Sequence, residues 1–153
     1  MEKLLRLLAE MEEAVPLAEK KSVIVSQSTI GWHIEHSLLV ISAIIDTLKK
    51  SEPGSYKWKF SISWLLVYSM ASIPRGRGKA PASVLPAGQG GIEKLQVQMK
   101  SVKEKYNDLD ALPKNAYFKH PYFGHLNLRP TRKFLVIHTE HHLKIIREII
   151  NSN

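Results

Sequence analysis

Residues 134–150 read FLVIHTEHHLKIIREII, and the helical pattern of the chain is clearest in this segment. Its apolar residues recur at intervals of three and four, so at about 100° per residue they form one stripe along a helix. The stripe is formed by Phe134, Leu135, Ile145, Ile146 and Ile149. We therefore predict an amphipathic helix that begins near Pro130, a favourable residue in a first helical turn, and continues to the end of the sequence.

Two histidines lie inside this apolar stripe, which directs two polar rings at the core. His138 and His142 are four residues apart, so their imidazoles lie one turn apart on the same face and can converge on one metal ion. The alternative is a pair of core histidines that hydrogen-bond to neighbouring carbonyls or hydroxyls. Each ring would then need its own buried partner, whereas a shared cation would orient both. Spacing alone leaves both interpretations open.

The segment GWHIEH, at residues 31–36, lies near the start of a second predicted helix. This helix follows the candidate N-caps Ser28 and Thr29 and ends before a Pro-Gly pair. It offers His33 and His36 as a third metal ligand. The helical wheel places His33 well inside the apolar side and His36 about 60° further round, toward the flank. Helical geometry alone therefore favours His33.

The remaining segments complete a helical pattern. Apolar spacing predicts a first helix that Pro16 ends and a third main helix that Asn107 and Asp108 end. A mixed stretch at 58–73 begins with strand-like alternation, but its second half favours a short buried helix. The main helices are expected at residues 4–15, 30–50, 92–106 and 130–153.

Two long connections separate these helices. Residues 74–91 contain three prolines and five glycines, and residues 111–130 are irregular and rich in aromatic side chains. We predict an all-α fold, a four-helix bundle with long crossover loops and a short extra helix, formed by a single domain that spans residues 1–153.

The first connection carries a basic loop, PRGRGK. Its glycines let Arg75, Arg77 and Lys79 approach an anion, but the loop lacks the G-K-S/T ending of a phosphate-binding P-loop. We favour a solvated basic loop over an anion site.

Composition limits the chemistry and the partners. The chain contains no cysteine, so disulfides and thiolate ligands are excluded and a metal site must use His, Asp or Glu. The net charge of +8 raises the question of a nucleic-acid partner, but the basic residues are spread along the chain, which disfavours that partner.

No apolar run approaches the roughly 20 residues that span a bilayer, and the N-terminal segment lacks a signal-peptide pattern. We expect a cytoplasmic protein without a membrane partner.

Three segments carry a resemblance to a known family. They are STIGWHIEHSLLVI at 28–41, HPYFGHLN at 120–127 and FLVIHTEHHLKII at 134–146. In this order they resemble the DinB-like superfamily of metal-dependent four-helix-bundle proteins, and most of all a branch of unknown function. The resemblance extends over nearly the whole chain and implies the same bundle fold.

The resemblance also implies a ligand set. In that family one histidine of the second helix and an H-x-x-x-H pair on the last helix bind a divalent ion, and the pair corresponds to His138 and His142. The second-helix histidine usually follows a Ser or Thr cap by seven residues, which from Thr29 gives His36. This spacing from the cap disagrees with the helical wheel. We follow the spacing, because a ring at the edge of the apolar stripe can still reach a neighbouring helix. The predicted ligands are His36, His138 and His142, with His33 as the alternative to His36.

The implied metal is nickel or zinc, with iron or manganese as alternatives. A three-histidine site that leaves coordination positions open is typical of catalysis. We therefore predict a metal-dependent enzyme that acts on a small-molecule substrate, either a transferase that uses a low-molecular-weight thiol or a hydrolase. The alternative is a non-catalytic metal- or ligand-binding helical module.

The catalytic residues stay unassigned. His33, Glu35 and His141 are unranked candidates for a general base. The order H-T-E-H-H differs from the H-E-x-x-H motif of zinc peptidases, so Glu140 is not placed as their base is.

The HPYFG segment, which contains His120 and is followed by His125, resembles a signature of the same family branch. We favour a tightly packed turn over direct chemistry, with Gly124 permitting the bend and Tyr122 and Phe123 packing on the end of the bundle.

The last helix carries apolar residues outside its main stripe as well. This second apolar side is formed by Val136, Ile137, Leu143 and Ile150. It predicts burial on both sides of the helix and a homodimer.

Overall fold

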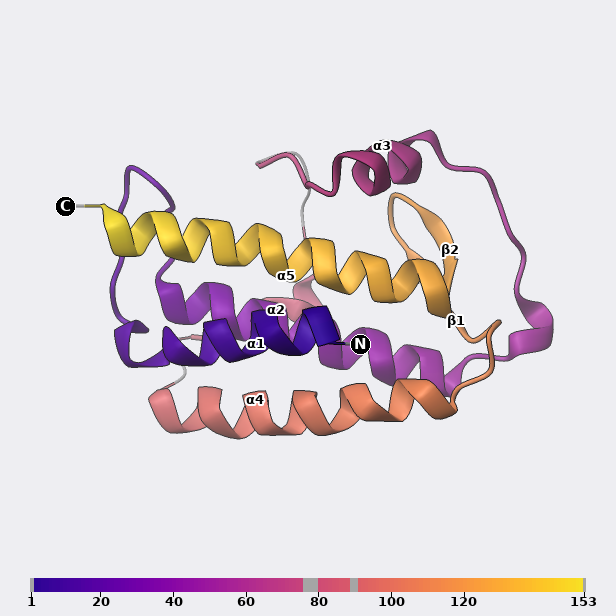
Figure 1. The fold of residues 1–153 in the computed structure, drawn as a ribbon, viewed down its shortest axis with the longest axis horizontal. Helices are drawn as coiled ribbons and strands as arrows, with labels where there is room; N and C mark the ends of the chain where they lie inside the picture. Colours follow the sequence, from indigo (N-terminus) through magenta and orange to yellow (C-terminus); the bar gives the residue numbers. More distant parts are fainter. Residues whose placement is uncertain (1, 76–79, 89–90, 153) are drawn as a thin grey trace.

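Long helices form most of the structure, a computed structural model that describes residues 2–75, 80–88 and 91–152. The four longest in the described residues are α1 (Glu2–Glu13), α2 (Ile30–Lys50), α4 (Ile92–Asn107) and α5 (Leu128–Asn151). They lie side by side in Figure 1, with α2 packed against α4 and α5, and α1 packed against the same two helices. The predicted helical character is confirmed.

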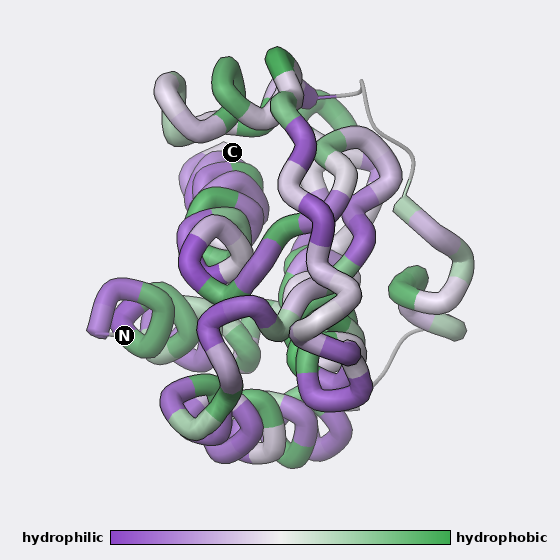
Figure 2. The backbone as a smooth tube through the Cα atoms, turned by 90° about the vertical axis from the view of Figure 1, so that its right-hand side faces the viewer, coloured by the Kyte–Doolittle hydropathy of each residue, from purple (hydrophilic) through white to green (hydrophobic). Residues whose placement is uncertain are grey.

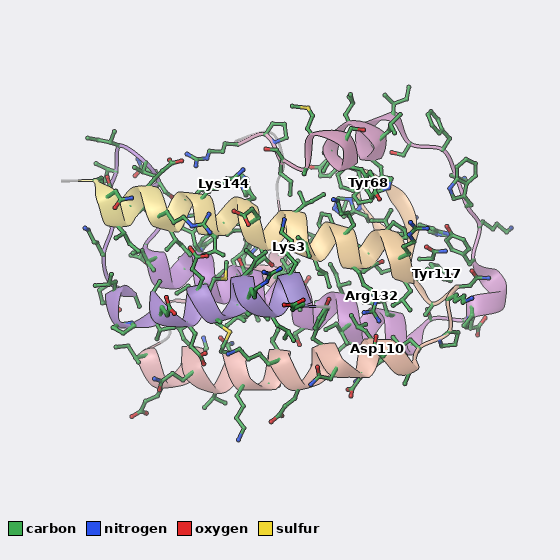
Figure 3. The ribbon with its side chains drawn as sticks, viewed as in Figure 1. Lys3, Tyr68, Asp110, Tyr117, Arg132 and Lys144 are labelled. Atoms are coloured by element: carbon green, nitrogen blue, oxygen red, sulfur yellow. The ribbon has the colours of Figure 1, made fainter. Side chains whose placement is uncertain are left out.

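Shorter elements connect and flank the long helices. They are the α-helix α3 (Ile62–Met70), the 3₁₀ turns η1 (Val15–Leu17), η2 (Pro53–Ser55), η3 (Ala82–Val84) and η4 (Asp108–Ala111), and the strands β1 (Tyr117–His120) and β2 (Gly124–Asn127). Ion pairs tie some of them to the long helices. Arg132 on α5 pairs with Asp110 in η4 at 2.7 Å. Both residues are labelled in Figure 3, where they lie next to each other.

The core lies between the long helices because each of them buries an apolar stripe. α1 buries Leu4, Leu7, Leu8 and Met11, which recur three and four residues apart. α5 is covered by α1 and by α2, so Ile137 and Leu143 on its second side are buried within the single chain. The predicted burial on both sides of this helix is confirmed.

Helix α2 is buried on two flanks because it contacts both α4 and α5. It begins as predicted at the cap Thr29, whose hydroxyl accepts the Trp32 N–H at 3.2 Å. As a result His33, Glu35 and His36 are all buried, although they point in different directions around the helix.

The all-α prediction is wrong in one place, because β1 and β2 form an antiparallel hairpin with His120 opposite Gly124. The turn requires a left-handed residue, and Gly124 supplies it with φ +75°. Phe118 and Leu126 pair across the hairpin and are both buried, which anchors its inner face. Strands of four residues leave too short an alternation to be recognised among prolines and aromatic residues.

The predicted short helix is present as α3, but the prediction that it is buried is wrong. It covers the hairpin turn through Trp64, which packs against Phe123, and its remaining side faces outward. Ile62 is 66% exposed and Met70 is 67% exposed. In Figure 2 the coil at the top of the molecule is α3, and it carries several hydrophobic turns. Among the described residues, no helix combines the length and the apolar character that a membrane span requires.

The basic loop that follows α3 is only partly described. Arg75 forms two hydrogen bonds with the Glu148 carboxylate, at 2.7 and 2.8 Å, and so its charge is matched by α5. Arg77 and Lys79 lie outside the described residues.

Candidate metal centre

Helices α2 and α5 bring three buried histidines together. His36, His138 and His142, the histidine triad, each offer one ring nitrogen, and these nitrogens lie within 4.8 Å of one another. The three side chains are 4%, 9% and 7% exposed. They therefore lie close enough to bind one metal ion.

The hydrogen bonds of His36 leave one nitrogen free for a metal. Its Nδ1 lies 2.8 Å from the carbonyl oxygen of Val84 in η3. Because a carbonyl only accepts, Nδ1 carries the proton and Nε2 keeps its lone pair. Trp32 stacks on the ring, with centroids 5.1 Å apart and planes at 16°, which holds its orientation. A backbone carbonyl in this role is typical behind a metal-bound histidine.

His142 is held by a second histidine. Its Nδ1 lies 3.0 Å from Nδ1 of His33, and His33 Nε2 lies 2.9 Å from the Ser26 hydroxyl. When the His142 Nε2 lone pair faces a metal, its Nδ1–H donates to His33, and His33 Nε2–H donates to Ser26. The same hydroxyl oxygen accepts the Ser28 N–H at 3.1 Å, which fixes the end of this chain. His33 therefore lies behind the triad and orients His142.

His138 provides a test of whether a metal fits. Its Nδ1 is buried and has no hydrogen-bond partner among the described residues. An unpaired ring nitrogen costs free energy in a dry interior, and a cation shared with two other imidazoles would remove part of that cost. Three nitrogen donors suit zinc, nickel and iron, whereas magnesium and calcium prefer oxygen. The residues present fit a transition metal.

Burial keeps the triad neutral at physiological pH. It lowers the pKa of His138 and of His142 well below 6.5, and the neighbouring histidines act in the same direction. Burial also lowers the pKa of His36, although the hydrogen bond to the Val84 carbonyl acts in the opposite direction. Neutral imidazoles keep the lone pairs that a metal needs.

The triad opens onto a cleft of about 560 Å³, a size suited to a small molecule. Aromatic side chains from α2, the hairpin and α5 form much of its wall, namely Trp32, Phe118, Tyr122, Phe123 and Phe134. His120 and His141 also line it.

No family model matches this chain, and neither a curated protein nor a solved structure matches it.

The candidates for a general base occupy different places. His141 lines the cleft, and burial lowers the pKa of its ring. Glu35 lies outside the cleft lining and pairs with Lys94 of α4 at 2.5 Å. His33 is engaged on both ring nitrogens. Of these three residues, only His141 lines the cleft.

Sequence reasoning missed three contributors to the site. The Val84 carbonyl lies in a connection without any motif, and Ser26 precedes the cap of α2, so neither gave a signal. The HPYFG segment did give one, but it was interpreted as packing. The structure bears out the turn at Gly124 and also places His120 in the cleft wall.

Proposed function

We propose that this protein is a metal-dependent enzyme in which His36, His138 and His142 hold one divalent ion, with nickel or zinc favoured and iron or manganese as alternatives. The observation that carries the proposal is the convergence of three buried, neutral histidines at the wall of an open cleft. The chain would then be a bundle protein of the DinB-like superfamily, as the three sequence segments suggest.

A catalytic role is supported by the coordination positions that three protein ligands leave open. Three protein ligands do not complete a tetrahedral shell, whereas structural zinc sites use four. When bound, such an ion supplies a Lewis acid that acidifies water or a thiol and polarises a substrate oxygen or sulfur. The chain's own residues would bind the substrate against the aromatic wall and orient it toward the triad.

The composition of the chain limits how each candidate reaction could proceed. No cysteine is present, so a transferase of this kind would take its thiol from a low-molecular-weight cosubstrate. A hydrolase would use water that enters through the cleft. In both cases the substrate is a small molecule, because the cleft is bounded and largely apolar.

Metal analysis of tag-free protein tests the proposal. We expect about one equivalent of a transition metal in the wild type and none in the double variant His138→Ala, His142→Ala, since two of three ligands are removed. His125→Ala is the matched control, because His125 is not in the triad and its ring packs against Tyr117 instead. A wild type that contains no metal and takes up none when zinc or nickel is added would refute the site.

Turnover assays on the metal-loaded protein separate the enzyme from the binding module. Activity on a panel of thiol acceptors, esters or amides that depends on the triad supports the enzyme. Inactivity throughout, with metal bound, would favour the module.

A further inference from the structure

His120 occupies a fixed position in the wall of the cleft. It ends β1, and its ring stacks on Phe123 with centroids 4.0 Å apart and planes at 10°. Phe134 meets the ring edge-on at 4.8 Å. Phe134 in turn lies 5.7 Å from the ring of His138. Two aromatic contacts therefore hold the imidazole one ring away from the triad.

The hydrogen bond of His120 sets its tautomer. The backbone N–H of Tyr122 donates to Nδ1 at 3.1 Å, so this nitrogen keeps its lone pair and Nε2 carries the proton. Burial lowers the pKa of His120 to about 4, which keeps the ring neutral at pH 7. The side chain is thus an N–H donor of fixed direction.

This donor has no partner in the part of the chain that the structure describes. Among the described residues no atom accepts a hydrogen bond from Nε2 of His120, and this nitrogen is not one of the fully buried unpaired atoms. Because His120 lines the cleft, Nε2–H is available to a molecule that enters it.

The rest of the wall indicates what that molecule is. The aromatic side chains offer contact to an apolar body, and Lys119 is the one formally charged side chain among the described residues that line the cleft. An N–H donor of fixed direction beside a largely apolar wall suits an uncharged compound that carries an acceptor oxygen.

We propose that His120 is a substrate-binding residue that donates from Nε2 to the carbonyl oxygen of an apolar, uncharged carbonyl compound in the cleft. This proposal deepens the proposed function by naming its substrate class. A neutral donor at that oxygen also favours the negative charge that develops there when a nucleophile attacks.

The test uses the metal-free full-length protein, so it does not depend on the metal site. Acetophenone is the probe, and α-methylstyrene is its near-isostere in which a CH₂ group replaces the carbonyl oxygen. Calorimetric titration gives the ratio of their dissociation constants in the wild type and in His120→Phe, which keeps an aromatic ring against Phe123. Comparing ratios removes the difference in hydrophobicity between the probes.

We expect His120→Phe to shift this ratio about tenfold against acetophenone, the loss of one hydrogen bond to a neutral donor. His120→Gln, which keeps an N–H at a similar reach, should recover part of the preference. His125→Phe, outside the cleft, should leave the ratio unchanged. Equal ratios in the wild type and His120→Phe would overturn the proposal, as would a wild type that binds neither probe. Zinc uptake by the same samples reports separately on the triad.

Discussion

His33 and His36 lie three residues apart on α2 and serve different purposes. The helical wheel favours His33 as the ligand because it shows which side of a helix faces the core. It does not show where a cleft opens, and this cleft opens on the flank that His36 occupies. Contacts across 109 residues, such as that of His33 with His142, are also invisible to a local pattern. For that reason the helical wheel could name both histidines but could not assign their roles, and only the spacing implied by the family resemblance favoured His36.

At this scale we expect His33→Ala to weaken metal binding without abolishing it. The variant removes the acceptor that orients His142, and loss of such a supporting hydrogen bond typically costs 10- to 100-fold in affinity. His36→Ala should cost far more, because it removes one of the three predicted ligands. Competition with a chromophoric chelator measures both constants, with His125→Ala as the control. Full retention of affinity in His36→Ala would reverse the two roles.

Acidification should destabilise the metal-free protein. Burial, followed by the neighbouring His36, lowers the pKa of His33 from 6.5 to about 4, and burial lowers that of His120 to about 4. Between pH 6.5 and about 4, these histidines are protonated in the unfolded chain but not in the folded chain. The free energy of unfolding therefore falls as the pH falls from 6.5 toward 4, by about 1.4 kcal/mol per pH unit for each such histidine at most.

Urea unfolding of the metal-free protein over this pH range measures the slope. His120→Phe should make it shallower, because one titrating group is removed. A free energy of unfolding that stays constant on acidification would contradict the burial of these rings.

At the scale of the element, local signals predicted the helices well and the hairpin not at all. Thr29 caps α2 and the apolar spacing sets α1, α4 and α5, because these features act within a few residues. The hairpin depends on Phe118, which is buried near Phe134 of α5 and is therefore stabilised by tertiary contacts. The exposed side of α3 was missed for a related reason, since apolar composition does not reveal whether another element covers it.

The start of α2 packs tightly against the segment before it. Gly31 donates its N–H to the Ala18 carbonyl at 2.8 Å, and a Cβ on Gly31 would lie 3.1 Å from both Cβ and the carbonyl oxygen of Ala18. Ala18 is itself buried and has little room to move. We expect Gly31→Val to lower the free energy of unfolding by about 2 kcal/mol through overpacking. Thermal unfolding measures the change.

Gly54→Val is the matched control, because a Cβ there meets nothing within 4 Å. It should change stability by less than about 0.5 kcal/mol. If the two variants unfold alike, the contact between Gly31 and Ala18 is not tight in solution.

At the scale of the whole molecule, the homodimer remains a prediction, but the surface expected to form its contact is no longer the second apolar side of α5. The second apolar side of α5 is largely covered within one chain, whereas the segment from Trp58 to Met70 exposes large apolar side chains. Trp58 is 71% exposed and Leu66 is 56% exposed. Exposed apolar surface gathered in one segment is typical of an interaction site. We expect the wild type to sediment as a dimer and this segment to form the dimer contact.

Leu66→Glu should shift the protein toward monomer, because it places a charge in the dimer contact. Val97→Glu is the control, since Val97 is equally apolar and 70% exposed but lies on α4. Sedimentation velocity measures both. A wild type that stays monomeric at high concentration would remove the dimer.

The distance along the chain between the two halves of the triad bears on how the protein is made. α2 is translated long before α5, so a nascent chain holds His36 without His138 or His142. A lone histidine on an emerging helix binds metal weakly, because the other donors have yet to be synthesised. An ion held by the triad would therefore not guide early folding, because its site would form only once α5 has packed against α2. The cleft beside the triad would be its way in, so metal loading would be a late event that chelators and metal supply can control.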